Sequence, residues 1–421
     1  MVYSSGLDKV NGDRMNNNHA GEGRLLTVLD SMHQGDWLTP QRLHGYPAVF
    51  LGLWLVGAAL WVALSDGIMD PWGRPLGSDF MGFWATAQLL LSGDGLAAYD
   101  EAALTAAQVA AAGTTEVPHY TMLYPPPGLL LILPLGLLPY LPALALWVLG
   151  TMAAYLAVLW QAWRHPLVPY LALAAPAVFV TVSHGQNAFL SGALLGGALL
   201  ALPRRPVLAG VLIGLLVYKP HLALVLPLAL MAGGYWRAIA SAAATVLALS
   251  LAATLAFGWA IWPAFLARTA FAREVLEQGY VPFFKMQSLY TALRMLGVES
   301  GPAFLAHWIL AGLVILSLAA LWRWSDSARL KAAGLMAAGL LATPFVLDYD
   351  LALLGLPIVL LARDGTERGV LSWEKTILAA AWALPLFARP LGQLTHLGIA
   401  WAVVLLLYAA VLRRAWQMRT A

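Results

Sequence analysis

The sequence predicts an all-α polytopic membrane protein. Three observations predict this class: 61% of the 421 residues are hydrophobic, only 11% are charged, and apolar runs recur along most of the chain. Soluble domains carry about 25% charged residues, so a water-soluble fold could not bury this much apolar surface. The 18 tryptophans suit long membrane interfaces, where indole rings prefer to lie. The chain has no cysteine, which excludes disulfides, thiol nucleophiles and thiolate metal sites.

The apolar runs predict about 11–13 transmembrane helices within a single membrane domain, 47–412. Several runs are shorter than the roughly 20 residues that an upright span needs, and no internal repeat is evident. The runs lie at about 47–64, 126–139, 141–162, 168–183, 186–202, 206–218, 221–233, 237–258, 303–322, 330–346, 349–362, 375–388 and 397–412.

Lysine and arginine in the short loops predict the orientation. A cytoplasmic N-terminus places every strongly basic loop on the cytoplasmic side. Residues 1–46 are then a polar cytoplasmic tail, 413–421 is a second one, and 65–125 is external, with one basic residue, Arg74, against seven acids. The basic loops hold Arg204, Arg205, Arg237, Arg323, Arg329, Lys331, Arg363, Arg368, Lys375, Arg413 and Arg414.

The segment 124–203 conflicts with this orientation, because its apolar runs are even in number whereas the orientation requires an odd number of crossings. One piece is therefore expected to be re-entrant, or two runs to form one broken span. The expected break points are "YPPPG" at 124–128 and "SHGQN" at 183–187. Irregular backbone at membrane depth is tolerated only where it lines a protein-enclosed or wet cavity, so a cavity is expected near these two stretches.

The first external segment, 65–125, is too long for a turn and contains two amphipathic patterns, 80–92 and 101–112. We expect both to form helices that lie in the membrane interface. A second external segment, 259–302, mixes aromatic and basic side chains and is also typical of an interface. Asp100 directly precedes the second helical pattern and is expected to cap that helix.

Asp79 is the first candidate for chemistry. It stands in "GSD" before the 80–92 pattern, so it is either the N-cap of that helix or a general base at the membrane surface. In "HGQN", the side chains of His184, Gln186 and Asn187 either satisfy a broken backbone or hydrogen-bond a sugar or phosphate.

Ionisable residues beside the spans form the remaining candidates, because such residues are costly and often functional. In "YKPH", Lys219 either extends to the interface or anchors a phosphate, and His221 accompanies it. In "TPFVLDYD", Asp348 and Asp350 either cap a span or meet a sugar hydroxyl or a cation. The bases of 259–302, among them Arg268 and Lys285, either hold a phosphate or meet anionic lipid.

Several function classes are disfavoured by missing motifs. The chain has no Walker motif, no GxGxxG, no HExxH and no histidines at metal-ligand spacing. ATP-driven and NAD-linked chemistry are therefore not expected, nor are a metal, another cofactor or a nucleic-acid partner. A substrate activated in advance and carried in the membrane fits these absences.

An ordered set of stretches resembles glycosyltransferase family 87, once called domain of unknown function 2029, over about residues 45–365. The resemblance implies a GT-C type of enzyme with interfacial helices in its first external loop and a polyprenyl-phosphate sugar as donor. The family includes mannosyl- and arabinosyltransferases. The matching stretches are "SDF..FWATAQLLLSG....YD", "YPPPGLLLILPLGLLP", "GQNAFLSGALLGGALL", "AGVLIGLLVYKPHLALVLPL", "QSLYTALRML" and "TPFVLDYDLALL".

The resemblance also implies roles for single residues. The family's catalytic acid lies in the first external loop, and Asp79 stands at the matching position. The lysine of the family's "KP" matches Lys219, which would hold the donor phosphate together with His221, Arg268 or Lys285. Family members often carry a histidine in the late motif, where this chain has Asp348 or Asp350.

The implied reaction is inverting transfer of a sugar to a lipid or glycan acceptor, among membrane lipids, outside the bacterial plasma membrane. The isoprenoid tail of the donor would lie between spans. Two other functions stay open: a flippase or transporter of lipid-linked sugars, and a surface-glycan polymerase or ligase that uses a diphosphate-linked donor.

Overall fold

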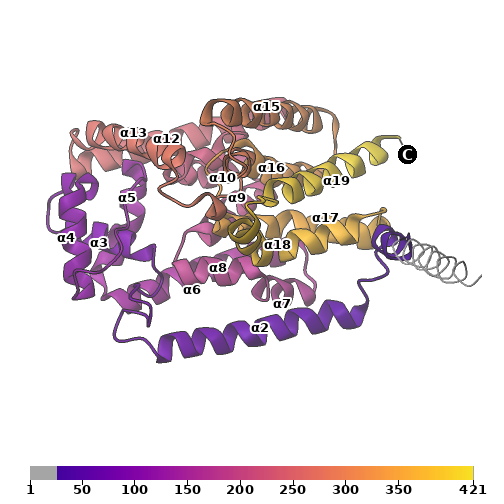
Figure 1. Cartoon of the computed structure of the whole chain (residues 1–421). Helices are drawn as coiled ribbons and strands as arrows, with labels where there is room; N and C mark the ends of the chain where they lie inside the picture. The colour runs from indigo at the N-terminus through magenta and orange to yellow at the C-terminus, as the bar shows by residue number, and fades with distance from the viewer. Residues whose placement is uncertain (1–25, 421) are drawn as a thin grey trace, which may run out of the picture.

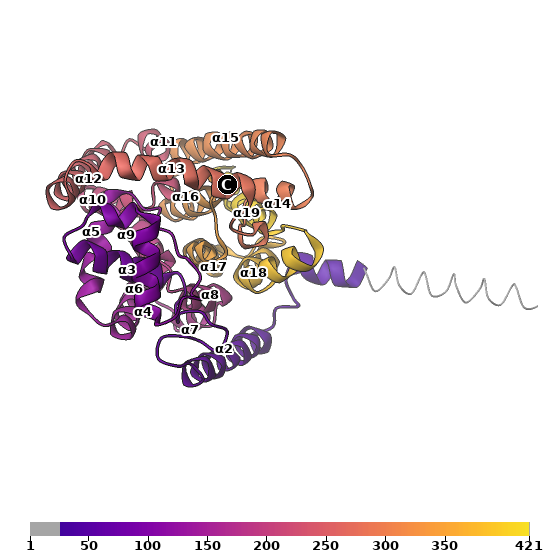
Figure 2. The same cartoon turned by 60° about the vertical axis from the view of Figure 1, so that its left-hand side comes forward.

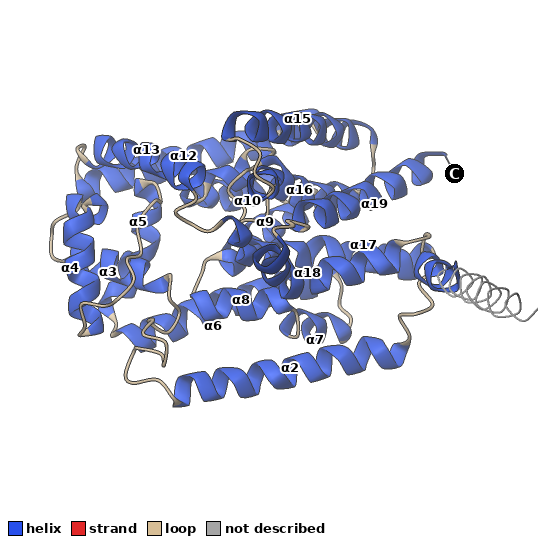
Figure 3. Cartoon of the chain, viewed as in Figure 1, coloured by secondary structure: helices blue, strands red, loops and turns tan. Residues whose placement is uncertain are grey.

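The computed structural model describes residues 26–420, and this part of the chain is helical throughout (Figure 3). Helices are joined by loops and short 3₁₀ turns, and the described residues form no strand. The prediction of an all-α protein is confirmed.

Five helices are long and apolar enough to cross a membrane. A sixth span is obtained if α7 (Leu167–Leu173) and α8 (Pro176–His184), which meet at a bend of 51°, count as one. The prediction of a polytopic membrane protein is therefore confirmed, although these spans are fewer than the expected 11–13. The five are α2 (Pro40–Ala63), α6 (Tyr140–Ala162), α12 (Trp236–Phe257), α15 (Ser300–Trp324) and α18 (Glu374–Thr395).

Most of the other apolar runs form shorter helices, which explains the difference in number. Several of them begin at a proline, which has no N–H and restricts the residue before it, so one helix cannot continue through the run. Helix α19 (Ala400–Thr420) is long, with 21 residues, but is not apolar enough to count as a span. The shorter elements are α5 (Pro126–Ile132) with η2 (Leu133–Leu137), α9 (Ala188–Ala201), α10 (Pro206–Gly214) with η3 (Leu215–Tyr218), η4 (Pro220–Ala223), α11 (Leu226–Ala232), α16 (Ala328–Ala342), and η6 (Asp348–Leu354) with α17 (Gly355–Arg368).

The broken segment expected within 124–203 is present as the bent pair α7 and α8. Its break lies at Ala174 and Ala175, directly before Pro176, and not at either expected stretch. "SHGQN" instead forms the turn between α8 and α9, and "YPPPG" leads into α5. The proline at the start of α8 explains the bend, since it removes a helical hydrogen bond and holds Ala175 in an extended conformation.

Helix α16 lies at the centre of the main core. All its residues from Ala332 to Ala342 are buried, and most of them are alanine or glycine. Small side chains let neighbouring helices approach closely, which is the usual basis of helix packing in membranes. Helices α9, α15, α17 and α19 pack around α16 in this way.

Helices α10 and α12 make the closest approach in the bundle. Gly210 and Gly214 lie one turn apart on α10, and they face Ser241 and Thr245 of α12. A Cβ atom on either glycine would overlap α12 atoms, so the pair works as a GxxxG contact.

A second core lies at the end of the molecule formed by α3 (Phe80–Leu91) and α4 (Glu101–Ala112), which are side by side in Figures 1 and 2. The expected helical patterns are thus both present. Helix α3 is largely buried, with Phe80 fully covered, so it is a packed element rather than a helix lying open on a surface. From the second external segment, α13 (Ile261–Gln278) covers this end, followed by η5 (Phe283–Lys285) and α14 (Leu289–Met295).

The start of α2 and the end of α19 both lie toward the opposite end of the molecule (Figure 1). Three of the arginines that the sequence places in cytoplasmic loops form ion pairs with acids at this end. Arg329 and Arg363 both pair with Glu367, and Arg414 pairs with Glu374. Helix α2 begins before the expected boundary at 46, and α19 runs through most of the expected second tail. Residues 1–25 of the expected N-terminal tail, and residue 421, lie outside the described part.

Candidate active site

Asp79 meets "HGQN" at the end of the bundle that carries α3. Its Oδ2 accepts a hydrogen bond of 2.9 Å from the Gln186 side chain, and its backbone N–H donates to the carbonyl of His184 at 3.0 Å. Although Asp79 occupies the N-cap position of α3, its side chain makes no capping hydrogen bond. The half-buried carboxylate is therefore directed toward the turn between α8 and α9.

That turn depends on Gly185. Its φ of +60° is left-handed, a conformation that glycine adopts without strain. The indole of Trp147 donates to the Gly185 carbonyl at 3.1 Å, which holds the turn against α6. The next two side chains, Gln186 and Asn187, are consequently buried and directed inward.

A buried ion pair lies behind Asn187. Lys219 Nζ is 2.5 Å from Asp350 Oδ1 and donates to Asn187 Oδ1 at 3.2 Å. Lys219 is only 3% exposed and Asp350 is fully buried, so the lysine does not extend to an interface. Asp350 Oδ2 also accepts a hydrogen bond from the backbone N–H of Leu347, the residue directly before η6.

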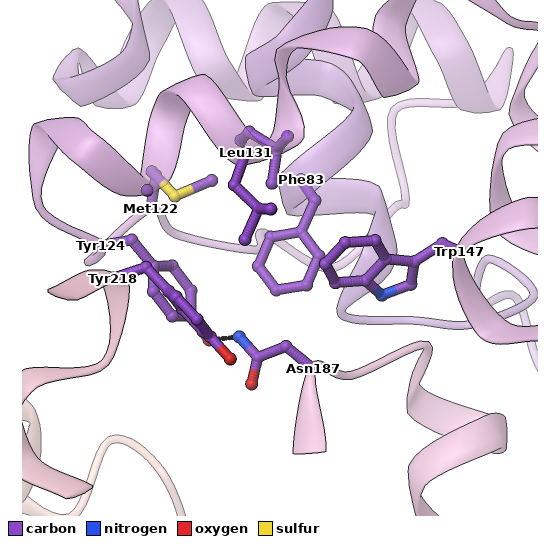
Figure 4. A pocket seen from close by; sticks show the side chains of 9 residues that line it. Phe83, Met122, Tyr124, Leu131, Trp147, Asn187 and Tyr218 are labelled. Carbon is purple, nitrogen blue, oxygen red and sulfur yellow. Dashed lines mark hydrogen bonds between the residues drawn. The ribbon is translucent and has the colours of Figure 1, made fainter. Parts of the chain in front are cut away.

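Asn187 connects this pair to a narrow, mostly apolar hollow (Figure 4). Its amide nitrogen donates to the Tyr124 hydroxyl at 2.8 Å, and the Tyr218 ring lies beside that of Tyr124. Phe83 and Trp147 form the opposite wall, with rings 5.9 Å apart. The hollow lies beside "YPPPG" and "HGQN", where a cavity was expected.

A second carboxylate site is formed by Asp348. Its Oδ2 lies 3.3 Å from Arg389 Nη1, and its Oδ1 accepts from the backbone N–H of Tyr349. Arg389 was not among the residues expected from the sequence, because it directly follows the apolar run 375–388. A cation at the end of an apolar span, before Pro390, is a signal that could have identified it.

Lys285 lies within electrostatic range of both carboxylates, Asp79 and Asp348. Its loop is fixed by a backbone bridge between Met286 and Leu347, and by a 2.7 Å hydrogen bond from the Gln287 N–H to the Val346 carbonyl. The half-buried ammonium makes no hydrogen bond or ion pair with any residue from 26 to 420.

Burial lowers the pKa of Lys285, and the charge of Arg389 lowers it further, whereas Asp79 and Asp348 oppose this shift. Lys285 is thus a cation without a partner in the described chain, and two acids act on it electrostatically. Such an ammonium is available to an anionic ligand.

His184 presents a free acceptor to the same region. Its Nδ1 lies 2.9 Å from the Val180 carbonyl, which can only accept, so Nδ1 carries the hydrogen. In the neutral ring Nε2 is then an acceptor, and it has no partner among the described residues.

Two of the expected phosphate-binding residues are placed elsewhere. Arg268 pairs with Glu101 and donates to Thr121, at the end that carries α4. Burial opposes ionisation of Glu101, but Arg268 and His119 outweigh it and lower the pKa of the carboxyl. His221 is close to Lys219 in the chain, but its ring packs near Phe345 and its Nε2 is buried without a partner in the described chain.

No group of three or more histidine or acidic residues has the arrangement of a metal site in the described part of the chain. The site consists of two carboxylates, two cations and a histidine, which are Asp79, Asp348, Lys285, Arg389 and His184. It can remove a proton and hold a negative charge.

A family comparison decides the class of protein, because the family model for glycosyltransferase family 87 matches residues 120–347, more than half of the chain. The chain belongs to glycosyltransferase family 87. Membership of family 87 makes it a membrane glycosyltransferase, as the family resemblance predicts. No curated protein and no solved structure matches the chain. The family 87 match contains Asn187, Lys219 and Lys285, whereas Asp79 and the late acids lie outside it.

Proposed function

We propose that this protein is a GT-C type glycosyltransferase that moves a sugar from a polyprenyl-phosphate donor to a hydroxyl of a lipid or glycan. The acceptor would be bound at the outer face of a bacterial plasma membrane, with Asp79 as general base. One observation carries the proposal: the half-buried Asp79 carboxylate makes no capping hydrogen bond, and it acts electrostatically on Lys285, a cation without a partner in the described chain. A base and an anion-binding group are thus held at one place.

The proposed reaction needs one base and charge stabilisation. Asp79 takes the proton of the acceptor hydroxyl, and that oxygen attacks the anomeric carbon of the donor sugar. The bond from this carbon to the phosphate oxygen breaks, its electron pair leaves with polyprenyl phosphate, and the configuration is inverted. Phosphate is a good leaving group, so one positioned base and nearby cations suffice.

The geometry favours Lys285, which has no partner in the described chain, as the group that holds the phosphate, whereas Arg389 already pairs with Asp348 and would only assist it. Lys219 is a weaker candidate than the resemblance implies, because Asp350 already neutralises its charge. Arg268 is engaged by Glu101 and takes no part in the proposal.

The sugar would lie between the phosphate and the base. The free Nε2 acceptor of His184 can accept a hydrogen bond from a sugar hydroxyl, and Asp348, one of the two acids that stand where the family often has a histidine, can accept one from a second hydroxyl. A hexose such as mannose or a pentose fits this chemistry. The isoprenoid tail would extend among the apolar helices into membrane lipid.

The test uses purified protein in lipid nanodiscs with polyprenyl-phosphate sugars. Asp79→Asn should abolish transfer while the protein stays folded, because an amide cannot accept the proton. Asp100→Asn is the matched control, since asparagine is an equally good helix cap. Retained turnover by Asp79→Asn would refute the base role.

The same assay separates the two rival functions. A flippase leaves the glycosidic bond intact, so release of polyprenyl phosphate excludes it. A polymerase or ligase transfers a block of sugars from a diphosphate-linked donor. The mass of the product therefore distinguishes it from single-sugar transfer.

A further inference from the structure

We propose that the buried Lys219–Asp350 ion pair is a positioning device, which orients the Asp79 carboxylate through Asn187 and Gln186. The inference rests on the proposed function of Asp79. It gives Lys219 a role different from phosphate binding.

The contacts form a continuous series from the ion pair to the carboxylate. Lys219 Nζ donates to Asn187 Oδ1 at 3.2 Å, and the Asn187 backbone N–H donates to Gln186 Oε1 at 3.2 Å. Gln186 Nε2 then donates to Asp79 Oδ2 at 2.9 Å. Every connecting side chain is buried, so water does not compete for these bonds.

These bonds also fix the direction of both amides. The ammonium of Lys219 can only donate, so the oxygen of Asn187 must face it and the Asn187 nitrogen must face Tyr124. The Asn187 N–H can likewise only donate, so the oxygen of Gln186 faces it and the nitrogen faces Asp79. Reversing either amide would place two donors or two acceptors together.

Stability alone does not explain the ion pair. A buried pair is often no more stable than well-packed apolar residues, because both charges lose their hydration. Removing only one partner, by contrast, leaves an uncompensated buried charge and is strongly destabilising. The pair is thus costly to keep, and holding Asn187, whose backbone N–H binds the Gln186 amide that faces Asp79, is a task that apolar residues could not perform.

The ion pair also borders the second carboxylate site. Lys219 lies over the ring of Tyr349, 5.0 Å from its centroid, and Asp350 is two residues from Asp348. Helix α8 and η6 pack against each other at this point. The ion pair therefore connects the turn between α8 and α9, which binds Asp79, with η6, which contains Asp348.

The test replaces both charges together. Lys219→Met/Asp350→Leu leaves no unpaired charge, so the double variant should fold, whereas either single variant should be destabilised. We expect the double variant to lose about 10- to 100-fold in kcat, since a displacement of about 1 Å in catalytic geometry can cost roughly 10²-fold. The donor KM should stay unchanged, because the pair does not touch the donor.

A second buried pair supplies the matched control. Arg414 and Glu374 are 4% and 2% exposed, and they lie at the other end of the molecule. Arg414→Met/Glu374→Leu should therefore leave kcat unchanged. Gln186→Leu should reduce kcat in the wild type and have little further effect in the Lys219/Asp350 double variant, because both act through one series of bonds.

Three results would overturn the inference: wild-type kcat in the double variant, a raised donor KM with unchanged kcat, or fully multiplicative losses with Gln186→Leu. The second result would return Lys219 to phosphate binding. If the double variant does not fold, Asn187→Leu removes the side-chain bond to Lys219 while keeping the backbone N–H that binds Gln186, and it should cause the same loss of kcat; wild-type kcat there would refute the idea. Turnover by Asp79→Asn would instead refute the proposed function itself.

Discussion

The turn at Gly185 allows a sharp test of how the site is built. Gly185→Ala adds one methyl group at a φ of +60°. The new Cβ would lie 2.6 Å from Phe80 Cβ, 3.0 Å from Leu144 Cδ1 and 3.1 Å from the Gly77 carbonyl oxygen. The two shortest of these contacts involve the packed end of α3 and α6, and the third is backbone.

The expected destabilisation has two parts. A left-handed conformation costs a residue with a Cβ atom about 1–2 kcal/mol. Crowding of a well-packed site adds about 1–3 kcal/mol. The free energy of unfolding should therefore fall by roughly 2–5 kcal/mol. Transfer activity should fall as well, because the two residues after the glycine hold the Asp79 carboxylate and the Lys219 ammonium.

The measurement is equilibrium unfolding in mixed micelles, with increasing denaturing detergent and circular dichroism as the signal. Gly113→Ala is the matched control: Gly113 has a φ of +69° at the end of α4, with nothing within 4 Å of the added Cβ. It should lose only the backbone part, about 1–2 kcal/mol. If Gly185→Ala loses no more than Gly113→Ala, the packing described around the turn is refuted.

Two further predictions concern helix packing and the anion site. Gly210→Val should lower the free energy of unfolding by about 1–3 kcal/mol, because α12 occupies the space that the valine side chain would need. The control Gly312→Val, with nothing within 4 Å of the added Cβ, should change this free energy by less than about 0.5 kcal/mol. Equal losses in the two variants would contradict the close approach of α10 and α12. Lys285→Gln should raise the donor KM by roughly 10- to 100-fold, the worth of a charged hydrogen bond, whereas the exposed Arg273→Gln should not. Burial and Arg389 lower the pKa of Lys285, so the ammonium loses its proton at a pH below 10.5, the usual pKa of a lysine. The wild-type donor KM should therefore begin to rise before the pH reaches 10.5, and a pH-independent KM would contradict the role.

Local features of the fold were predictable from the sequence. Helix α4 has the bounds that its pattern predicts, and Asp100 caps it through a 2.7 Å hydrogen bond from the Ala103 N–H. Such features depend on neighbouring residues, which a sequence displays directly. The apolar runs also predicted the membrane class, but prolines divide several of them into helices too short to count as full spans.

The partners of the site residues were not predictable, because they are distant in the chain. Asp79 is 107 positions from Gln186, and Lys219 is 131 positions from Asp350. The sequence identified all four residues as polar groups beside apolar runs, yet it could not show that they bond to one another. It therefore left helix capping open for Asp79 and interface anchoring open for Lys219. The structure disfavours each of these roles, because Asp79 makes no capping hydrogen bond and Lys219 is buried.

The same distance has a consequence for synthesis of the protein. A ribosome delivers Lys219 well before Asp350 exists, and a buried charge without its partner is strongly destabilising. The nascent chain therefore holds an unmatched ammonium until Asp350 emerges, when only about the last sixth of the chain is left to be made. Chains that terminate before residue 350 should insert less stably and should be degraded faster by quality-control proteases. The segment that carries Asp350 therefore determines whether the segment that carries Lys219 is stable in the membrane.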